Sequence, residues 1–482
     1  MSIYDKLREV ETRNMSMPAI VYLGKRITYY NLFSMVDSLS KNLKDIGIKK
    51  NDKVALIAGN SVQFAVSLLA LYKIGAISFF LNDHDEPENY GIDEVITSCY
   101  NYRNLKGNYK NVIVIRDEDF GPFGTSISKY FLERNCPDKI KWSDSVVKFS
   151  SLIFDNVNDR KADIGPDDVI ISKYTKKENK IYGIREKNIE AAISLLDSVF
   201  SNYKKNVAIC SSLRKISSVN FLIFSLINGG TATIMPDNYP VPESVKIINN
   251  SDSNIVCGDP FFYMNVIKAL NKNEFKKIRF FIMPGQHMKE NFYSDFFKKT
   301  GKAVIEGYDI TGATGLVALN DLEKPTEGSS GKILDKISYK IAGVADDPMN
   351  GILQIKSDTV CANTDEDGYF NTLDSITVND ESFIFIKEST ENIINGTIFS
   401  YEDIENTVKK SGLAKDLASA LVDGEYSREI KLFISGKDRG NLKKIKAYCR
   451  DNLPYYLIPS HYGFIDKIPR SPAGKIMRGE LK

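Results

Sequence analysis

The sequence predicts an α/β protein with a large N-terminal domain of parallel or mixed sheets with flanking helices, followed by a small, mobile α+β C-terminal domain. Strand, helix and strand patterns alternate over residues 53–81, and the same alternation returns over residues 207–306. Such a unit implies a parallel sheet. The last hundred residues instead combine single helices with short strands. We therefore expect two domains, residues 1–386 and 387–482.

The first strand, helix and strand unit is clearly patterned. Residues 53–58 form a short apolar strand. Asn60, with Gln63 three residues later, is expected to cap the helix that follows, and Gly75 is expected to end that helix. Residues 76–81 then form the next strand.

The remaining elements follow from the same apolar spacing. In the large domain they are a helix over 32–43, a helix through 221–226, and strands at 207–210, 231–235, 278–283 and 303–306. In the C-terminal domain they are a helix from about residue 400, strands at 418–422 and 429–434, a helix over 442–453 and a strand at 462–466.

Composition excludes several classes of protein. Lysine and arginine total 64 against 62 acidic residues, so a net charge of +2 gives no reason to expect nucleic acid or an anionic membrane as partner. The longest apolar stretch, residues 64–81, is interrupted by Lys73 and Gly75 and is too short to span a bilayer. The N-terminus lacks a signal or transit pattern.

Six cysteines are scattered along the chain and are expected to be reduced thiols of a cytoplasmic protein. A zinc site is not expected.

Four segments together suggest a family. They are IAGNSVQFAVSLLALYKIGA at 57–76, EGYDITG at 306–312, GSSG at 328–331 and IPRSPAGKIMR at 468–478. In this order and spacing the sequence resembles the adenylate-forming superfamily, which includes acyl-CoA synthetases, peptide-synthetase adenylation domains and firefly luciferase. The resemblance covers nearly the whole chain, and the tail is its most specific part.

The resemblance implies a reaction in two halves. A carboxylate attacks the α-phosphate of ATP, giving an acyl-adenylate and pyrophosphate, and a thiol or amine then displaces AMP. The first half needs positive charge at the transferring phosphate. The resemblance assigns that role to Lys475, and it places the hydroxyl of Thr311 near the α-phosphate. A solvated tail lysine is the alternative for Lys475.

The nucleotide is assigned by the same resemblance. Asp374, in DGYFNTLD at 367–374, matches the ribose-binding aspartate, since a carboxylate accepts hydrogen bonds from both ribose hydroxyls. Tyr308 matches an aromatic ring that stacks on adenine. Gly285 and Gln286 match the segment that lines the adenine site. A turn-forming aspartate and a core tyrosine are the alternatives for Asp374 and Tyr308.

Three departures from the family pattern fall in the nucleotide site. The family's Ser/Thr/Gly-rich phosphate loop, whose backbone N–H groups bind phosphates, is replaced over residues 172–188 by lysines, of which Lys180 matches best. Gly312 stands where the family has an acidic residue associated with Mg²⁺. Glu388 stands where the family has an arginine that contacts the nucleotide.

The substrate side lacks the aspartate that holds an amino group in peptide-synthetase adenylation domains. Residues 211–219 (SSLRKISSV) contain no acid, so an α-amino acid is not expected as substrate. Arg214 and Lys215 suit an acid with extra negative charge, although exposure on the surface is the simpler interpretation. No carrier domain follows the tail, so the acceptor is expected to be CoA or the phosphopantetheine of a separate carrier protein.

Two hypotheses remain open at this point. The first is an ATP- and Mg²⁺-dependent ligase that activates a small carboxylic acid and passes the acyl group to a thiol or amine. The second is a degenerate family member that no longer makes adenylates and instead binds an acyl group or adenylate, or serves as a scaffold. The altered 172–188 loop, Gly312 and Glu388 favour the second, whereas Asp374 and Lys475 favour the first.

Overall fold

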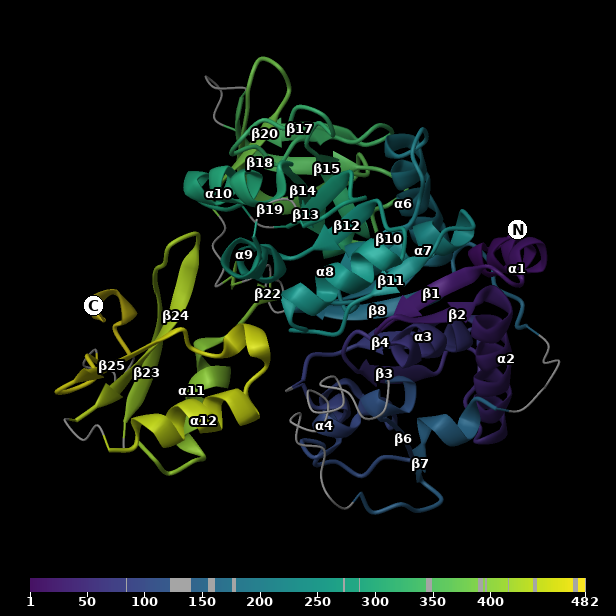
Figure 1. Ribbon diagram of the computed structural model, residues 1–482, viewed down its shortest axis with the longest axis horizontal. Helices are drawn as coiled ribbons and strands as arrows, with labels where there is room; N and C mark the ends of the chain where they lie inside the picture. Colours follow the sequence, from purple (N-terminus) through teal and green to yellow (C-terminus); the bar gives the residue numbers. More distant parts are fainter. Residues whose placement is uncertain are drawn as a thin grey trace. The chain divides into compact units, whose positions relative to one another are not determined.

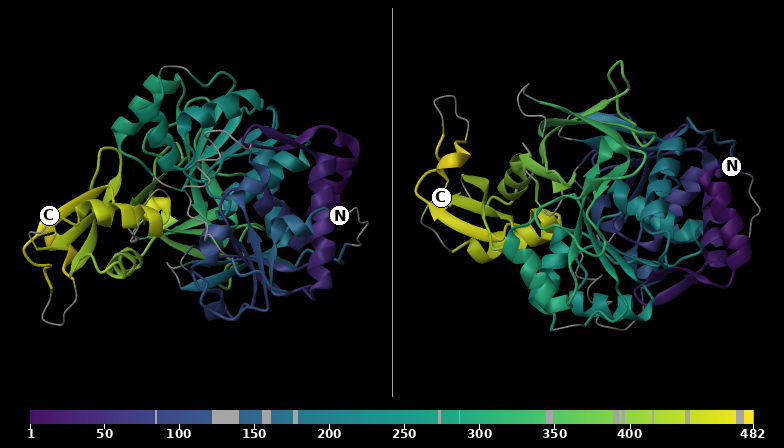
Figure 2. Two further views of the ribbon diagram at one scale, coloured as in Figure 1. Left: turned by 60° about the horizontal axis from the view of Figure 1, so that its bottom comes forward. Right: turned by 90° about the horizontal axis from the view of Figure 1, so that it is seen from above.

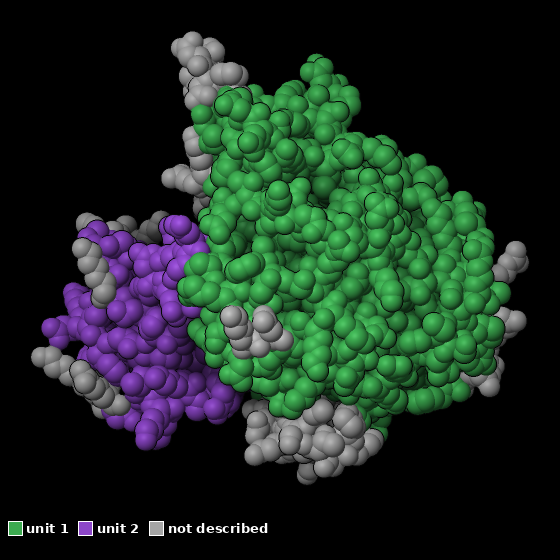
Figure 3. All heavy atoms as spheres, turned by 45° about the horizontal axis from the view of Figure 1, so that its top comes forward, with its two compact units in different colours: residues 1–287, 293–388 green, residues 288–292, 389–482 purple. Residues whose placement is uncertain are grey.

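A computed structural model describes residues 1–83, 85–121, 140–154, 161–175, 179–271, 274–285, 287–343, 349–388, 393–394, 397–414, 416–436, 440–470 and 476–481. Its backbone contacts divide the chain into two compact units, coloured separately in Figure 3. Unit 1 comprises residues 1–287 and 293–388. Unit 2 comprises residues 288–292 and 389–482.

A nine-stranded sheet forms one layer of unit 1. In spatial order its strands are β16 (Lys332–Ile333), β15 (Gly315–Leu319), β14 (Val304–Ile310), β13 (Phe280–Pro284), β12 (Ile255–Gly258), β10 (Val207–Cys210), β11 (Ala232–Ile234), β1 (Pro18–Tyr22) and β2 (Lys25–Thr28). The central strands from β1 to β14 pair in parallel, and both edges are antiparallel.

A seven-stranded sheet forms a second layer of unit 1. Its order is β7 (Val146–Lys148), β6 (Asn111–Ile115), β5 (Glu94–Ser98), β3 (Lys53–Ile57), β4 (Ile77–Phe80), β8 (Val169–Thr175) and β9 (Lys180–Arg185). Only the β8–β9 hairpin is antiparallel among these pairs. The expected class, an α/β fold with parallel and mixed sheets, is confirmed.

Helices pack between these two sheets and against one another (Figures 1 and 2). The helices that contact one another are α1 (Ile3–Asn14), α2 (Tyr29–Asp45), α3 (Val62–Ile74), α6 (Glu186–Val199) and α7 (Ile216–Ile227), and the last four of these also contact strands. Every residue of α3 is buried, as expected for a helix covered on all sides. The further helices of unit 1 are α4 (Cys99–Tyr102), α8 (Val241–Asn250), α9 (Pro260–Ala269) and α10 (Glu290–Thr300), whose first three residues belong to unit 2.

A four-stranded antiparallel sheet completes unit 1. Its order is β17 (Ser338–Ala342), β18 (Asn350–Lys356), β19 (Phe370–Val378) and β20 (Ile384–Glu388). A single bridge between Gly331 and Ile384 connects it to the chain that leads into β16. This connection brings β19 toward β14, and both strands carry predicted site residues.

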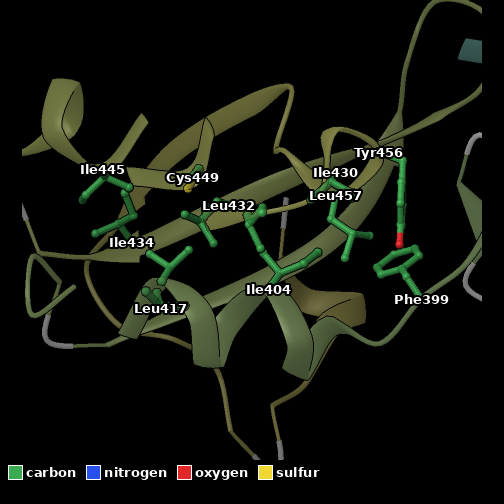
Figure 4. Close-up of a cluster of buried hydrophobic side chains, with 12 residues drawn as sticks. Phe399, Ile404, Leu417, Ile430, Leu432, Ile434, Ile445, Cys449, Tyr456 and Leu457 are labelled. Atoms are coloured by element: carbon green, nitrogen blue, oxygen red, sulfur yellow. The ribbon is translucent and has the colours of Figure 1, made fainter. Parts of the chain in front are cut away.

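Unit 2 has a small core of its own. A three-stranded sheet of β23 (Leu417–Asp423), β24 (Arg428–Ser435) and β25 (His461–Ile465) is accompanied by α11 (Tyr401–Lys409) and α12 (Leu442–Asn452). Figure 4 shows apolar side chains from both helices and the strands directed into this core, among them Ile404, Leu432 and Ile445. A short hairpin, β21 (Ile393–Ile394) and β22 (Thr397–Ile398), precedes α11.

The expected cap at Asn60 is wrong. Ser61 caps α3 and accepts a hydrogen bond from the backbone N–H of Phe64 at 3.1 Å. Asn60 points to the loop after β10, where it donates to the Ser211 carbonyl at 2.8 Å and accepts from the Leu213 N–H at 2.6 Å. Its amide therefore joins the two sheet layers, a role that local sequence does not reveal.

The expectation that the cysteines are reduced thiols is wrong for Cys99. Cys99, buried at the start of α4, is disulfide-bonded. Cys210, Cys257, Cys361 and Cys449 are free.

Across the residues described above, no helix is both long and apolar enough to cross a membrane.

Candidate active site

The predicted nucleotide motif follows a central strand of the nine-stranded sheet. Residues 306–310 end β14, and Thr311 begins a 3₁₀ turn that ends at Ala313. The neighbouring parallel strand, β13, ends just before Gly285. In parallel sheets, ligands bind beyond the carboxyl ends of the strands. The motif thus lies where the fold class predicts a ligand site.

Two predicted residues meet directly at this edge. The hydroxyl of Tyr308 donates a hydrogen bond to Oδ2 of Asp374 at 2.5 Å. Tyr308 is 4% exposed on β14, and Asp374 is 9% exposed on β19. Leu373, just before Asp374, has a φ of +62°, which turns the chain at this point. The contact joins two different sheets and fixes the direction of a buried carboxylate.

The predicted adenine segment lies beside β14. Gly285 has a φ of +87°, and its N–H donates to the Gly307 carbonyl at 2.8 Å. Gln286, the second residue predicted here, lies outside the described residues. Glycine suits position 285, because positive φ is costly for residues with a Cβ.

A buried glutamate next to this segment, the first residue of EGYDITG, makes contacts that the motif alone does not reveal. Glu306, 3% exposed, accepts a hydrogen bond from the hydroxyl of Tyr293. Its carboxylate oxygens lie 3.3 Å from Nδ1 of His287. Hydrogen bonding to Glu306 raises the pKa of His287 above its usual value. The segment that follows Gly285 is therefore held by a charged, hydrogen-bonded cluster.

The turn after β14 has no room for an acidic side chain. Thr311 is half-buried, and the carbonyl of Gly312 accepts hydrogen bonds from the N–H groups of Cys361 at 2.9 Å and Ala362 at 3.2 Å. A Cβ on residue 312 would lie 2.8 Å from Cζ of Phe370. The ring of Phe370 thus fills the space of the missing acid, and this position does not fit a Mg²⁺ ligand.

The altered phosphate loop connects β8 to β9. Lys180 is the first residue of β9, is paired with Thr175, and has an exposed side chain. Lys176 and Lys177 lie outside the described residues. Lys173, on β8, points inward and donates a hydrogen bond to the carbonyl of Arg214. Burial lowers the pKa of Lys173 to about 8.

A second acid lies within the motif itself. The pairing of β14 with β15 shifts register between Tyr308 and Asp309, and such irregularities redirect side chains next to active sites. Asp309 accepts a hydrogen bond from the hydroxyl of Ser217, at the start of α7, at 2.8 Å. Burial raises the pKa of Asp309, an effect opposed by that hydrogen bond and by nearby Lys215 and Lys173. Asp309 was not singled out from the sequence, although its place inside EGYDITG was a usable signal.

Arg214 is not a surface residue, so the simpler sequence interpretation is wrong for it. It is 7% exposed, and its guanidinium lies 2.6 Å from Oδ1 of Asp83. Asp83 also accepts from the amide of Asn101 at 2.8 Å. The guanidinium is therefore engaged by protein and is not left for a substrate anion.

Two predicted site residues remain, Lys475 and Glu388. Lys475 lies outside the described residues. Glu388 ends β20, and its backbone is opposite Ser375, the residue after Asp374. The backbone of residue 388 thus pairs with the strand that carries the predicted ribose-binding Asp374. Within the described ranges, no group of three or more His, Cys, Asp and Glu residues is arranged to hold a metal.

Comparison with known proteins identifies the family. The sequence matches the AMP-binding enzyme family over residues 7–93 and 184–361, more than half of the chain. A long-chain-fatty-acid–CoA ligase of Escherichia coli O157:H7 is 23% identical, with 100% of this chain and 94% of the relative covered. A 4-coumarate–CoA ligase 3 of Oryza sativa is 22% identical over 95% of this chain and 87% of the relative.

Solved structures share the fold. The o-succinylbenzoate CoA synthetase of Bacillus subtilis, bound to a product analogue, superimposes with a TM-score of 0.73 at 16% identity, covering 100% of this chain and 98% of that one. An anthranilate CoA ligase in complex with anthranoyl-AMP gives a TM-score of 0.69 at 15% identity, covering 100% and 96%. The chain therefore belongs to the AMP-binding enzyme family, as an acyl-CoA synthetase-like member of the adenylate-forming superfamily that its motifs resemble.

Proposed function

We propose that this protein is an ATP-dependent ligase that joins a carboxylic acid to a thiol through an acyl-adenylate. The observation that carries the proposal is the buried contact between Tyr308 and Asp374. It places an aromatic ring and a directed carboxylate together at the end of β14. These are the two groups needed to hold a purine and a ribose.

Each predicted residue has a role in this proposal. Tyr308 stacks on adenine, with Gly285 and Gln286 lining the same site, and Asp374 binds the ribose hydroxyls. Thr311 binds an α-phosphate oxygen. Lys475 neutralises the charge that develops when the carboxylate oxygen bonds to the α-phosphorus and the bond to pyrophosphate breaks.

The phosphates require a different set of groups from those of a glycine-rich loop. We propose that Lys180 and its neighbours on the β8–β9 hairpin hold them as point charges. Mg²⁺ with ATP would lower the charge of the pyrophosphate leaving group. Position 312 itself does not fit a metal ligand, because Phe370 fills the space beside it.

We propose that the second half-reaction, in which the acyl group passes to the acceptor, depends on movement of the C-terminal domain. We propose that residues 387–482 form a mobile domain that turns about a hinge near residues 386–389. One orientation brings Lys475 to the adenylate, and the other admits the acceptor. The acceptor thiolate attacks the acyl carbon and AMP leaves. We propose CoA as acceptor, with carrier-protein phosphopantetheine as the alternative source of the same thiol, and a cytoplasmic location where both are available.

The test is acid-dependent exchange of labelled pyrophosphate into ATP. We expect exchange with at least one acid from a panel of alkanoic, hydroxy, dicarboxylic and aryl acids, and we expect Asp374→Ala to reduce it at least tenfold. Asp335→Ala, an acid elsewhere in unit 1, is the control. Absence of exchange across the panel, together with no ATP binding by calorimetry, would instead favour a degenerate acyl- or adenylate-binding protein.

A further inference from the structure

Helix α7 holds the turn after β14 through two of its side chains. Ser217 and Asn220 are three residues apart on α7, so they lie on the same face of the helix. The hydroxyl of Ser217 donates a hydrogen bond to Oδ2 of Asp309 at 2.8 Å. Nδ2 of Asn220 donates to the carbonyl of Thr314 at 2.7 Å. These two bonds therefore hold the chain on either side of the turn that begins at Thr311.

Thr314 has a strained backbone within this arrangement. Its φ of +56° lies in the left-handed region, which is rare for a β-branched residue and persists only where the surrounding structure enforces it. Thr314 is fully buried, and its hydroxyl donates to the Thr359 carbonyl at 2.6 Å. Its N–H donates to the carbonyl of Thr311 at 3.0 Å. The conformation of Thr314 therefore helps to fix where Thr311 lies.

The turn and α7 pack backbone against helix. Gly315, the next residue, has a φ of +108°, and a Cβ there would lie 2.8 Å from Nδ2 of Asn220. The same Cβ would lie 3.4 Å from the backbone N of Ser217. Such close packing means that a change at Asn220 is transmitted directly to the turn.

The amide of Asn220 is only half satisfied. Asn220 is 3% exposed, and its Oδ1 accepts no hydrogen bond from the residues that the structure describes. Burying an amide oxygen without a partner is costly. Asn220 also lines a small cavity whose walls are mainly apolar, with Leu195 and Leu316 among them. Folding alone would therefore favour an apolar residue at position 220, and the donor to Thr314 is what asparagine adds.

We infer that Asn220 is a positioning residue for the formation of the acyl-adenylate. Its Nδ2 holds the Thr314 carbonyl, which keeps Thr314 in the left-handed conformation and thereby keeps Thr311 in place to bind the α-phosphate. This inference rests on the proposed function and adds to it a residue that lies outside every motif. Asn220 acts only through the turn.

The variant that tests this role is Asn220→Leu, which is similar in size and enters an apolar surrounding. It exchanges one unsatisfied oxygen, Oδ1 of Asn220, for another, the Thr314 carbonyl, so the melting temperature should change by less than about 3 °C. In pyrophosphate exchange with an acid that supports it, kcat should fall at least tenfold, because Thr311 acts where charge develops in the transition state. The KM values for ATP and for the acid should change less than about threefold.

A second substitution separates positioning from general damage. Glycine adopts the left-handed conformation without support. In a Thr314→Gly background, Asn220→Leu should therefore lower kcat less than about threefold, whereas a merely structural effect would be equal in both backgrounds. The matched control is Asn42→Leu on α2. The half-buried amide of Asn42 donates to the Leu152 carbonyl at 3.0 Å, and its loss should leave kcat unchanged.

The outcomes separate this inference from the proposed function. An unchanged kcat in Asn220→Leu, or an equal loss with and without Thr314→Gly, overturns the role of Asn220 and leaves the ligase intact. If Asn220→Leu does not fold, Asn220→Ser, whose shorter side chain loses the same contact, replaces it in the same comparison. No exchange by the natural protein with any acid overturns the proposed function and this inference with it.

Discussion

Single side chains decide how the nucleotide end of the site is built. Tyr308 has two tasks, because its ring is proposed to stack on adenine while its hydroxyl holds Asp374. Phe370 fills the space beside Gly312 where an acid would otherwise stand. The replacement of the family's acidic residue by Gly312 is thus accompanied by a ring that fills the freed space. Such compensation is expected of a well-packed site.

Removing the Tyr308 hydroxyl should weaken ATP binding. Tyr308→Phe keeps the ring but leaves Asp374 without this donor, and a hydrogen bond to a charged group contributes about 1.5–3 kcal/mol. We expect the dissociation constant for ATP, measured by calorimetry, to rise roughly tenfold. Tyr29→Phe is the control, because that hydroxyl donates to the Leu226 and Gly230 carbonyls instead. Equal effects of the two variants on ATP binding would rule out a specific role for Tyr308.

Glu186 should make stability depend on pH. It is 3% exposed and accepts from the Ile3 N–H at 2.7 Å and from the hydroxyl of Tyr72. Burial raises the pKa of Glu186 to about 7 from 4.5. The folded protein therefore keeps a proton that the unfolded chain releases near pH 4.5, so stability falls as pH rises from about 4.5 to 7.

The matching variant is Glu186→Gln, which cannot titrate. Between pH 5 and pH 8 the natural protein should lose up to about 3 kcal/mol more unfolding free energy than the variant. Urea denaturation of both proteins at the two pH values measures this difference. If the unfolding free energies of the two proteins changed equally between pH 5 and pH 8, Glu186 would be ionised in the folded protein over that whole range.

At the scale of elements, one turn links the sheets that carry Tyr308 and Asp374. Gly331 has a φ of +96°, and its carbonyl accepts from the Ile384 N–H at 2.9 Å. A Cβ there would lie 2.0 Å from the carbonyl carbon of Leu319. The approach is backbone to backbone, so no side chain can move aside to make room.

Gly331→Ala should therefore be strongly destabilising. Positive φ and backbone overlap together are expected to cost about 3 kcal/mol or more. Gly165→Ala is the control, because its Cβ would come no closer than 3.9 Å to the Asp168 carboxylate. Thermal unfolding should show a fall of several degrees for the first variant only. Similar melting temperatures for both variants would mean that the turn relaxes easily.

Elements with a clear apolar period could be predicted from sequence, and contacts between them could not. The strand expected at 207–210 is β10, and the helix expected through 221–226 is α7, because both are buried and regularly patterned. The contacts of Lys173 with Arg214 and of Ser217 with Asp309 join residues 41 and 92 positions apart. Such pairs depend on how the sheets pack, which no local pattern encodes.

The same distinction applies to the candidate site. The resemblance to the family was enough to choose Tyr308 and Asp374, which the structure brings into contact. It did not reveal Asp309 or the Glu306 and His287 cluster, because a buried charge is recognised only by its neighbours. It also misjudged Arg214, since a charged residue in a loop is usually exposed.

At the scale of the whole molecule, the proposed chemistry needs both units. Unit 1 carries Tyr308, Asp374 and Thr311, and Lys475 belongs to the chain of unit 2. Each unit has its own buried core, as domains that move as bodies require. The two half-reactions should therefore separate when the acceptor is withheld.

The most direct test is a single turnover without CoA. Enzyme in excess over ATP, mixed with an acid that supports exchange, should yield acyl-AMP and pyrophosphate in equal amounts, detected by mass spectrometry. Added CoA should then convert the acyl-AMP to acyl-CoA and AMP, while Lys475→Ala should form acyl-AMP at least 100-fold more slowly. Acyl-CoA formed with no acyl-AMP before it, or an unchanged rate in Lys475→Ala, would contradict the proposed mechanism.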